Sequence, residues 1–207
     1  MGVFRELLCE TYKKANITMK LISTLLFFLF AKVAVAQISI LPIDTISYQV
    51  SFTEVINVDS ATAKDLFSRG KLWFAKTYKS SNAVIQNIDN ESFSITGKAN
   101  MRAYAQFIGT RTWGYVNYTI SIFCKDGRYK YLISDFSHEG DPFASASTLT
   151  PSVGPINKLT KDSGGFGSYR KKDFDRLCQE INSDMINLIS SLKNDMNKKT
   201  ETETKDW

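Results

Sequence analysis

Histidine and cysteine are scarce in this sequence, and the motifs of several large enzyme classes are missing. The 207 residues include one histidine and three cysteines, and no two cysteines have the spacing of a zinc-binding motif. The sequence also contains no Gly-x-Ser-x-Gly turn, no phosphate-binding loop and no dinucleotide fingerprint. We therefore expect no metal, no cofactor and no enzymatic activity.

Long hydrophobic runs are also missing. The longest, from Leu21 to Ala31, falls short of the roughly 20 apolar residues that a membrane-spanning helix needs. It follows the basic start Met19-Lys20 and precedes Ala34-Val35-Ala36, an arrangement typical of a secretory signal and its cleavage site. We predict that residues 1–36 are a leader, with Met19 as the true start, and that the cleaved protein is exported, either periplasmic or secreted. An uncleaved membrane anchor is the alternative.

Excess positive charge is small once this leader is removed. The whole chain has 26 basic and 21 acidic residues, and the leader holds five of the basic and two of the acidic ones. The net charge therefore falls from +5 to +2. Nucleic-acid binders usually carry a strong basic patch, so we expect no nucleic-acid partner.

Cys124 and Cys178 are the cysteines that remain after cleavage. Each falls on the apolar side of its predicted element, which suits a small buried side chain. In an oxidising compartment the two could instead form a disulfide bond. The sequence leaves both alternatives open.

Hydrophobic periodicity predicts five strands and two helices. Period-two alternation indicates strands, and spacing of three and four residues indicates helices. The predicted strands lie at 46–53, 84–88, 93–107, 115–125 and 128–138, and the predicted helices at 60–79, with Asp59-Ser60 as N-cap, and 170–196. We expect one α+β domain over residues 37–196, with two helices on one face of an antiparallel five-stranded sheet, in the order β-α-β-β-β-β-α.

Asp126-Gly127 is the strongest turn signal in the chain. A two-residue turn here places Lys125 opposite Arg128 and fixes the register of both strands. On the face that we expect to be the core, this register pairs Ile120 with Ile133, Ile122 with Tyr131 and Cys124 with Tyr129. On the other face it pairs Ser121 with Leu132 and Phe123 with Lys130.

Small residues occupy the middle of the strand predicted at 93–107. Gly97, Ala99, Ala103 and Ala105 all fall on one face of it. Such residues let another element approach the backbone closely. We therefore expect another element of the fold to approach this strand closely.

Three segments break the periodic pattern. Gly109 to Gly114 separates two predicted strands, residues 139–168 form a long loop rich in Ser, Thr, Gly and Pro, and residues 197–207 form a polar, disordered tail. Loops this long inside a domain are usually functional or disordered. A phosphate site after Gly164-Gly165-Phe166-Gly167 is conceivable, but a flexible linker explains that run without a ligand.

Four stretches of the chain carry a resemblance to a known family. They are Tyr48-Gln49-Val50, the helix segment Leu66 to Tyr78 with Trp73-Phe74, Thr96-Gly97-Lys98, and Tyr118-Thr119-Ile120 leading to Lys125-Asp126-Gly127-Arg128-Tyr129. Over residues 46–138 the chain resembles a bacterial family of secreted proteins of unknown function with a TATA-box-binding-protein-like (TBP-like) fold. The resemblance implies this fold and brings no catalytic residues.

The sheet face turned away from the core is more apolar than a solvated face should be. By the register above it carries Tyr115, Asn117, Phe123, Lys130, Leu132 and Phe136. Exposed patches of this kind often mark binding surfaces, and we predict a binding site formed by Tyr115, Phe123, Lys130, Leu132 and Phe136. The alternative is that the loop at 139–168 folds back and covers this face.

These patterns favour an exported, non-enzymatic binding or interaction module of the bacterial cell envelope, whose partner is an unknown envelope protein or ligand. A small hydrolase is the alternative, with His138 as general base beside Glu139 and Asp141. A partly exposed histidine at a strand end, without a catalytic role, is the simpler interpretation. Nucleic-acid binding is suggested only by the namesake of the fold.

Overall fold

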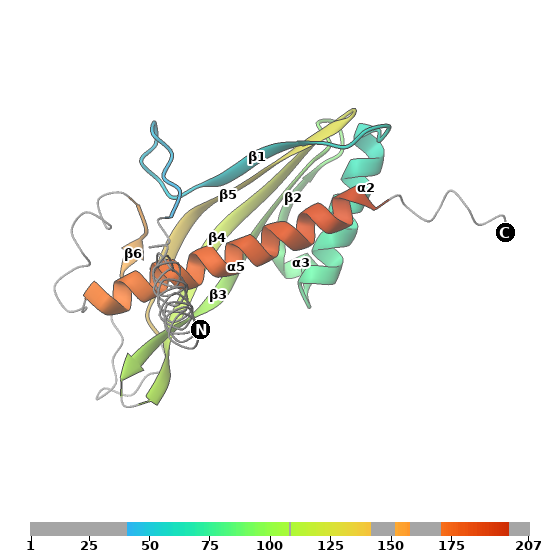
Figure 1. Cartoon of the computed structure of the whole chain (residues 1–207). Coiled ribbons are helices and arrows are strands. Elements are labelled where there is room, and N and C mark those ends of the chain that lie inside the picture. The colour runs from blue at the N-terminus through green and yellow to red at the C-terminus, as the bar shows by residue number, and fades with distance from the viewer. Residues whose placement is uncertain (1–40, 108, 142–151, 158–170, 199–207) are drawn as a thin grey trace, which may run out of the picture. The chain divides into compact units, whose positions relative to one another are not determined.

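An antiparallel sheet and a layer of helices make up the part of the chain that the computed structural model describes, residues 41–107, 109–141, 152–157 and 171–198 (Figure 1). The strands are β1 (Phe52–Asn57), β2 (Ile85–Asp89), β3 (Ser94–Phe107), β4 (Gly109–Lys125), β5 (Arg128–Glu139) and β6 (Gly154–Pro155). The helices are α2 (Ala63–Thr77), α3 (Ser81–Val84) and α5 (Lys171–Asn197). The predicted leader, the Gly164–Gly167 run and the tail from 199 onward lie outside these residues.

The strands follow the order β1-β5-β4-β3-β2, and β6 pairs with the end of β5. All pairings are antiparallel. The fold class, the order of the predicted elements and the pairing across the Asp126-Gly127 turn are confirmed, from Lys125 opposite Arg128 to Ile120 opposite Ile133. The short helix α3 and the two-residue strand β6 are additions to the prediction.

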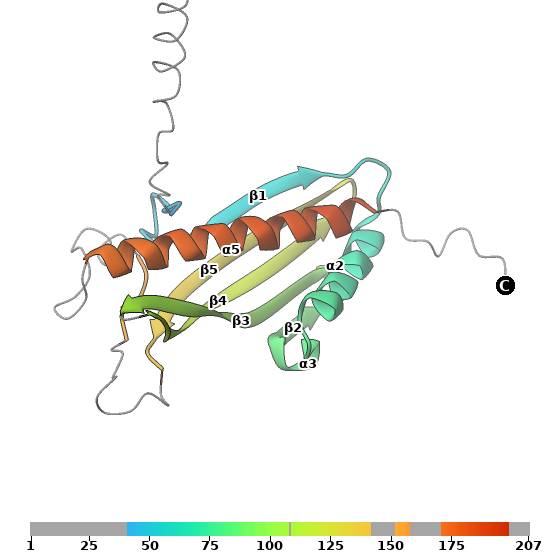
Figure 2. The same cartoon turned by 60° about the horizontal axis from the view of Figure 1, so that its bottom comes forward.

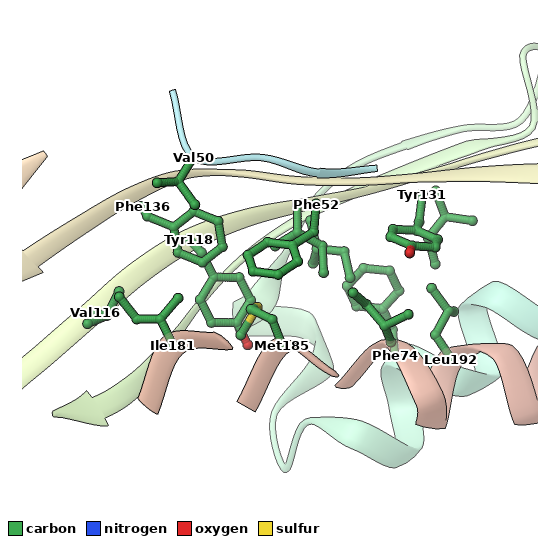
Figure 3. Packing of buried hydrophobic residues seen from close by; sticks show 14 of the residues in the cluster. Val50, Phe52, Phe74, Val116, Tyr118, Tyr131, Phe136, Ile181, Met185 and Leu192 are labelled. Atoms are coloured by element: carbon green, nitrogen blue, oxygen red, sulfur yellow. The ribbon is translucent and has the colours of Figure 1, made fainter. Parts of the chain in front are cut away.

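Both long helices pack against one face of the sheet (Figure 2). Their buried residues recur at helical spacing and form the core with the inward side chains of the strands (Figure 3). Hydrogen bonds join the helices, among them one from the Trp73 Nε1–H to Ser191 Oγ at 3.2 Å and one from Arg69 Nη1 to the Met196 carbonyl at 2.8 Å. No helix in the described ranges combines the length and hydrophobicity needed to cross a bilayer.

At Gly97 the helix α2 and the residue Val84 of α3 come very close to the sheet. A Cβ atom at this position would lie 2.8 Å from Cε1 of Phe74 and 3.2 Å from the carbonyl oxygen of Val84. Only glycine leaves room for both neighbours. The close approach that the small residues of this strand predict is therefore confirmed at Gly97.

The first strand starts later than its alternation predicts. Asp44 Oδ1 accepts hydrogen bonds from the backbone N–H groups of Ile46 and Ser47, which closes a turn there. Tyr48 has a φ of 57°, which departs from extended backbone and interrupts the predicted alternation. Ile46 and Tyr48 are exposed, so β1 begins at Phe52 rather than Ile46.

The first long helix also starts later than predicted. Thr62, not Asp59-Ser60, is its N-cap. The Thr62 side chain accepts from the Asp65 N–H at 3.1 Å, and Asp65 Oδ2 accepts from the Thr62 N–H at 3.2 Å. This reciprocal pair is a capping box, whereas Ser60 has a φ of 62° and lies in the preceding turn.

The break predicted from Gly109 to Gly114 is wrong, because β4 runs through it. A bulge accommodates the irregularity: Ala103 pairs with Gly114 and Tyr104 with Thr112, so Trp113 is the extra residue. Gly114 has a φ of 117°, and a Cβ atom there would collide with the Glu139 carbonyl oxygen. The glycine therefore shapes the strand rather than ending it.

Part of the 139–168 loop belongs to the sheet. Gly154 pairs with His138 and Pro155 with Ser137, and the side chains of Val153 and Ile156 are buried in the core. Among the described residues of this stretch, Gly154 and Pro155 pair with β5, and a run of two residues is too short to produce a periodic pattern.

Candidate binding face of the sheet

The sheet face opposite the helices, here called the outer face, carries every second side chain of β3, β4 and β5. Tyr115, Phe123, Lys130 and Leu132 belong to it as predicted, as does Asn117. None of these side chains is fully buried. Since both long helices lie against the other face (Figure 2), neither of them covers these residues.

Phe136 is not on the outer face, and that part of the predicted site is wrong. A bulge in β5 sets Asp135 and Phe136 opposite the single residue Tyr118, between the pairs Asn117–Ser137 and Thr119–Ser134. The extra residue reverses the alternation. Phe136 therefore points into the core, where it is 2 % exposed and packs on Tyr118 and Phe52 with ring centroids 6.0 and 5.8 Å apart (Figure 3).

The same bulge borders a hollow in the outer face. The hollow has a volume of about 360 Å³ and is lined by Lys98, Ala99, Asn100, Asn117, Tyr118, Thr119 and Asp135. Of these residues, Ala99 and Tyr118 belong to the inward-facing series of β3 and β4. The other five residues contribute polar or charged side chains.

The chemistry of the hollow is mixed. Lys98 supplies a positive charge and hydrogen-bond donors, and Asp135 supplies a negative charge and acceptors. Asn100, Asn117 and Thr119 can both donate and accept. Asp135 has a φ of 58°, a left-handed conformation that aspartate tolerates better than most residues. The hollow therefore suits a small polar group that carries donors and acceptors of its own.

An apolar area lies at the hairpin end of the outer face. Phe123 pairs with Lys130, which pairs with Val55 of β1. Phe123 is 40 % exposed and Val55 is 56 % exposed. The register therefore sets Lys130 between two exposed hydrophobic residues, and exposed apolar surface of this kind is common at binding sites.

Five further residues of the outer face were not predicted from the sequence: Val55, Lys98, Asn100, Thr119 and Asp135. The period-two pattern of the strand at 93–107 already separates Lys98 and Asn100 from the inward alanines. Asp135 could not be placed in this way, because no feature of the sequence marks the bulge. Val55 lies beyond the end of the alternation from which β1 was predicted.

His138 is fully buried, not partly exposed as the simpler interpretation expects. Its Nε2 lies 3.1 Å from the carbonyl oxygen of Trp113, and its Nδ1 accepts the Val153 N–H at 3.1 Å. This pattern places the ring proton on Nε2 and keeps the imidazole neutral. Burial lowers the pKa of His138 from 6.5 to about 4. With both nitrogens occupied inside the core, the ring has no access to a substrate.

Two thiols and a hydrogen-bonded pair of tyrosines are further ionisable groups in the part of the chain that the structure describes. Cys124 and Cys178 are both thiols, and burial raises the pKa of Cys124 to about 12, which leaves it unreactive at neutral pH. Tyr78 and Tyr118 share a hydrogen bond of 3.3 Å between their hydroxyl groups, and burial raises both pKa values. Among the described side chains, no group of His, Cys, Asp and Glu could hold a metal ion.

Comparison with known proteins gives a family match over part of the chain and no match that carries an activity. Residues 52–139 match the family described as domain of unknown function (DUF4468) with TBP-like fold. No curated protein matches the chain.

Two crystal structures are similar in shape. One is a TBP-like protein from Parabacteroides distasonis, 16 % identical, with a TM-score of 0.49, covering 74 % of this chain and 97 % of that protein. The other is a DUF4468 family protein from Bacteroides ovatus, 14 % identical, with a TM-score of 0.49, covering 72 % and 89 % respectively. The match over residues 52–139 confirms the resemblance to a family of unknown function with a TBP-like fold.

Proposed function

We propose that this protein is an exported, non-enzymatic binding module of the bacterial cell envelope, and that it holds its partner on the outer face of the sheet. The secretory pattern before Gln37 supports export. The observation that carries the binding role is the polar hollow in the outer face, which also presents the exposed Phe123 and Val55 further toward the hairpin end. A hollow with convergent polar groups next to apolar surface is a common form of ligand site.

The geometry gives the hydrolase alternative no support. A general base must reach the proton that it removes, and His138 is enclosed by Trp113 and Val153. The chain has no other histidine. A binding role needs only the surface groups that the outer face already presents.

A co-sedimentation assay with insoluble envelope material tests the proposal. The protein lacking residues 1–36 is mixed with purified peptidoglycan and with outer-membrane vesicles of the producing bacterium, and the bound fraction is measured. Asn117→Trp fills the hollow, and Phe123→Ser removes the exposed ring. We expect each change to weaken binding at least tenfold.

Leu72→Ser is the matched control, because Leu72 is 49 % exposed and lies on α2 rather than on the sheet. This variant should bind as the unchanged protein does. The proposal is overturned if no envelope fraction binds the unchanged protein, or if Leu72→Ser weakens binding as much as Asn117→Trp.

A further inference from the structure

Strand β3 has an open edge beyond the end of β2. The pairing of β2 with β3 stops at Ile85 opposite Gly97, where the chain leads back into α3. At the far end, the Tyr104 N–H donates to Glu180 Oε2 of α5 at 3.2 Å. Between these limits, no strand in the described ranges pairs with the free side of Lys98 to Ala103 (Figure 2). This open edge is about 20 Å long.

The register shows which backbone groups point outward from the open edge. The Cys124 N–H donates to the Phe93 carbonyl, so the odd-numbered residues of β3 bond to β4. The even-numbered residues must point the other way, which agrees with the bond from the Tyr104 N–H to Glu180. Lys98, Asn100 and Arg102 therefore direct their N–H and C=O groups away from the sheet, as a template for another strand.

The side chains along the open edge differ between its two sides. On the outer face, Lys98 and Arg102 are exposed and form no salt bridge with any described residue. On the helix side, Ala99 and Met101 are half-buried and pack against the core. A strand added here would place alternate residues beside two positive charges and the residues between them beside apolar surface.

We propose that the open edge of β3 binds an extended segment of a partner protein, with acidic residues at alternate positions and apolar residues between them. In strand addition of this kind, main-chain hydrogen bonds provide the affinity, and the side chains at alternate positions provide the specificity. The site goes beyond the proposed function, because it lies at the rim of the sheet and uses Arg102, which does not line the hollow.

A second copy of the chain fits this edge poorly. Two-fold antiparallel pairing of β3 with itself makes the most bonds when the Asn100 residues face each other. That register sets Lys98 of one copy opposite Arg102 of the other. Like charges directly opposite in a sheet are destabilising, so an acidic segment is the better complement.

The probe is a capped heptapeptide in which glutamate and valine alternate, with affinity measured by calorimetry on the protein lacking residues 1–36. We expect binding that falls steeply when lysine replaces glutamate in the peptide. Two N-methylated forms test the backbone bonds. If the peptide pairs antiparallel to β3, its glutamate N–H groups form the bonds to the open edge, and methylation of the glutamate nitrogens should abolish binding. If it pairs parallel, its valine N–H groups form these bonds, and methylation of the valine nitrogens should abolish binding. If both forms bind as well as the parent peptide, the proposal is wrong.

Variants at Arg102 test the same site from the protein side. Arg102→Thr removes the charge and keeps the N–H, so affinity should fall roughly twofold to fivefold. Arg102→Pro also removes the outward N–H while sparing the bonds to β4, as edge prolines do, and affinity should fall a further tenfold or more. Equal affinity of the two variants for the peptide would overturn the proposal. It would also be overturned if the unchanged protein formed a dimer that Arg102→Pro dissociates.

The co-sedimentation of Asn117→Trp is independent of these results, so the proposed function and the proposed edge site can fail separately.

Discussion

Phe74 of α2 lies so close to Gly97 of β3 that a Cβ atom at residue 97 would stand 2.8 Å from the phenyl ring. Gly97→Ala must therefore displace the ring or the Val84 carbonyl, which would lie 3.2 Å away. We expect it to lower the free energy of unfolding by about 1–3 kcal/mol, measured by urea denaturation. Asn100→Ala, on the exposed face of the same strand, is the control and should change stability by less than about 0.5 kcal/mol. Equal effects would contradict the close approach.

The N-cap of α2 gives a second prediction. Thr62→Ala removes the side-chain acceptor of the capping box, and we expect a loss of about 1 kcal/mol in the free energy of unfolding. Asp59→Ala tests the N-cap that the sequence pattern suggests and should have little effect. Denaturation midpoints of the two variants decide between the two helix starts, and a larger loss for Asp59→Ala would support the sequence-based one.

His138 predicts how stability depends on pH. Its pKa is 6.5 in an unfolded chain and about 4 in the folded protein, so between these values the unfolded state binds more protons. The free energy of unfolding should therefore have its full value above pH 6.5. It should fall as the pH drops from 6.5 to 4, by on the order of 3 kcal/mol.

Comparison with His138→Gln isolates this effect. Burial raises the pKa values of Glu180 and Asp184, and these groups favour the folded state as they gain protons. The difference between the two proteins cancels their contribution, so the histidine effect should appear as a steeper loss in the unchanged protein. Parallel urea-denaturation profiles from pH 7 to 4.5 would contradict the buried neutral imidazole.

The bulge at Asp135 gives a fourth prediction. With a φ of 58° at this residue, Asp135→Gly should leave stability unchanged or raise it, while Asp135→Val should lower it, because left-handed backbone costs a β-branched residue about 1–2 kcal/mol. Thermal melting of the two variants measures the difference. If Asp135→Val is as stable as Asp135→Gly, the bulge is misplaced.

The sequence predicts the parts of the fold that depend on regular patterning. The register across Asp126-Gly127 follows from turn geometry, and both long helices follow from their apolar stripes. The errors occur where backbone conformation departs from a regular repeat. Tyr48 and Ser60 adopt positive φ values before the first strand and helix, and Trp113 is an inserted residue in β4.

The candidate site could be predicted only in part for the same reason. Phe123, Lys130 and Leu132 lie within reach of a well-defined turn, so their face follows from simple alternation. Phe136 lies just beyond the inserted Asp135, where alternation assigns the wrong face. His138 depends on contacts with Trp113 and Val153, both remote in sequence, so its burial had no local signal.

Radical footprinting tests the central claim, that the outer face of the sheet is the binding surface, most directly. Oxidation of Tyr115 and Phe123 on the outer face is compared with that of Leu72 and Ile186, exposed positions on α2 and α5, with and without the envelope fraction that binds. Our account predicts that bound material protects Tyr115 and Phe123 and leaves Leu72 and Ile186 unchanged. Protection of the two helix residues alone would contradict it.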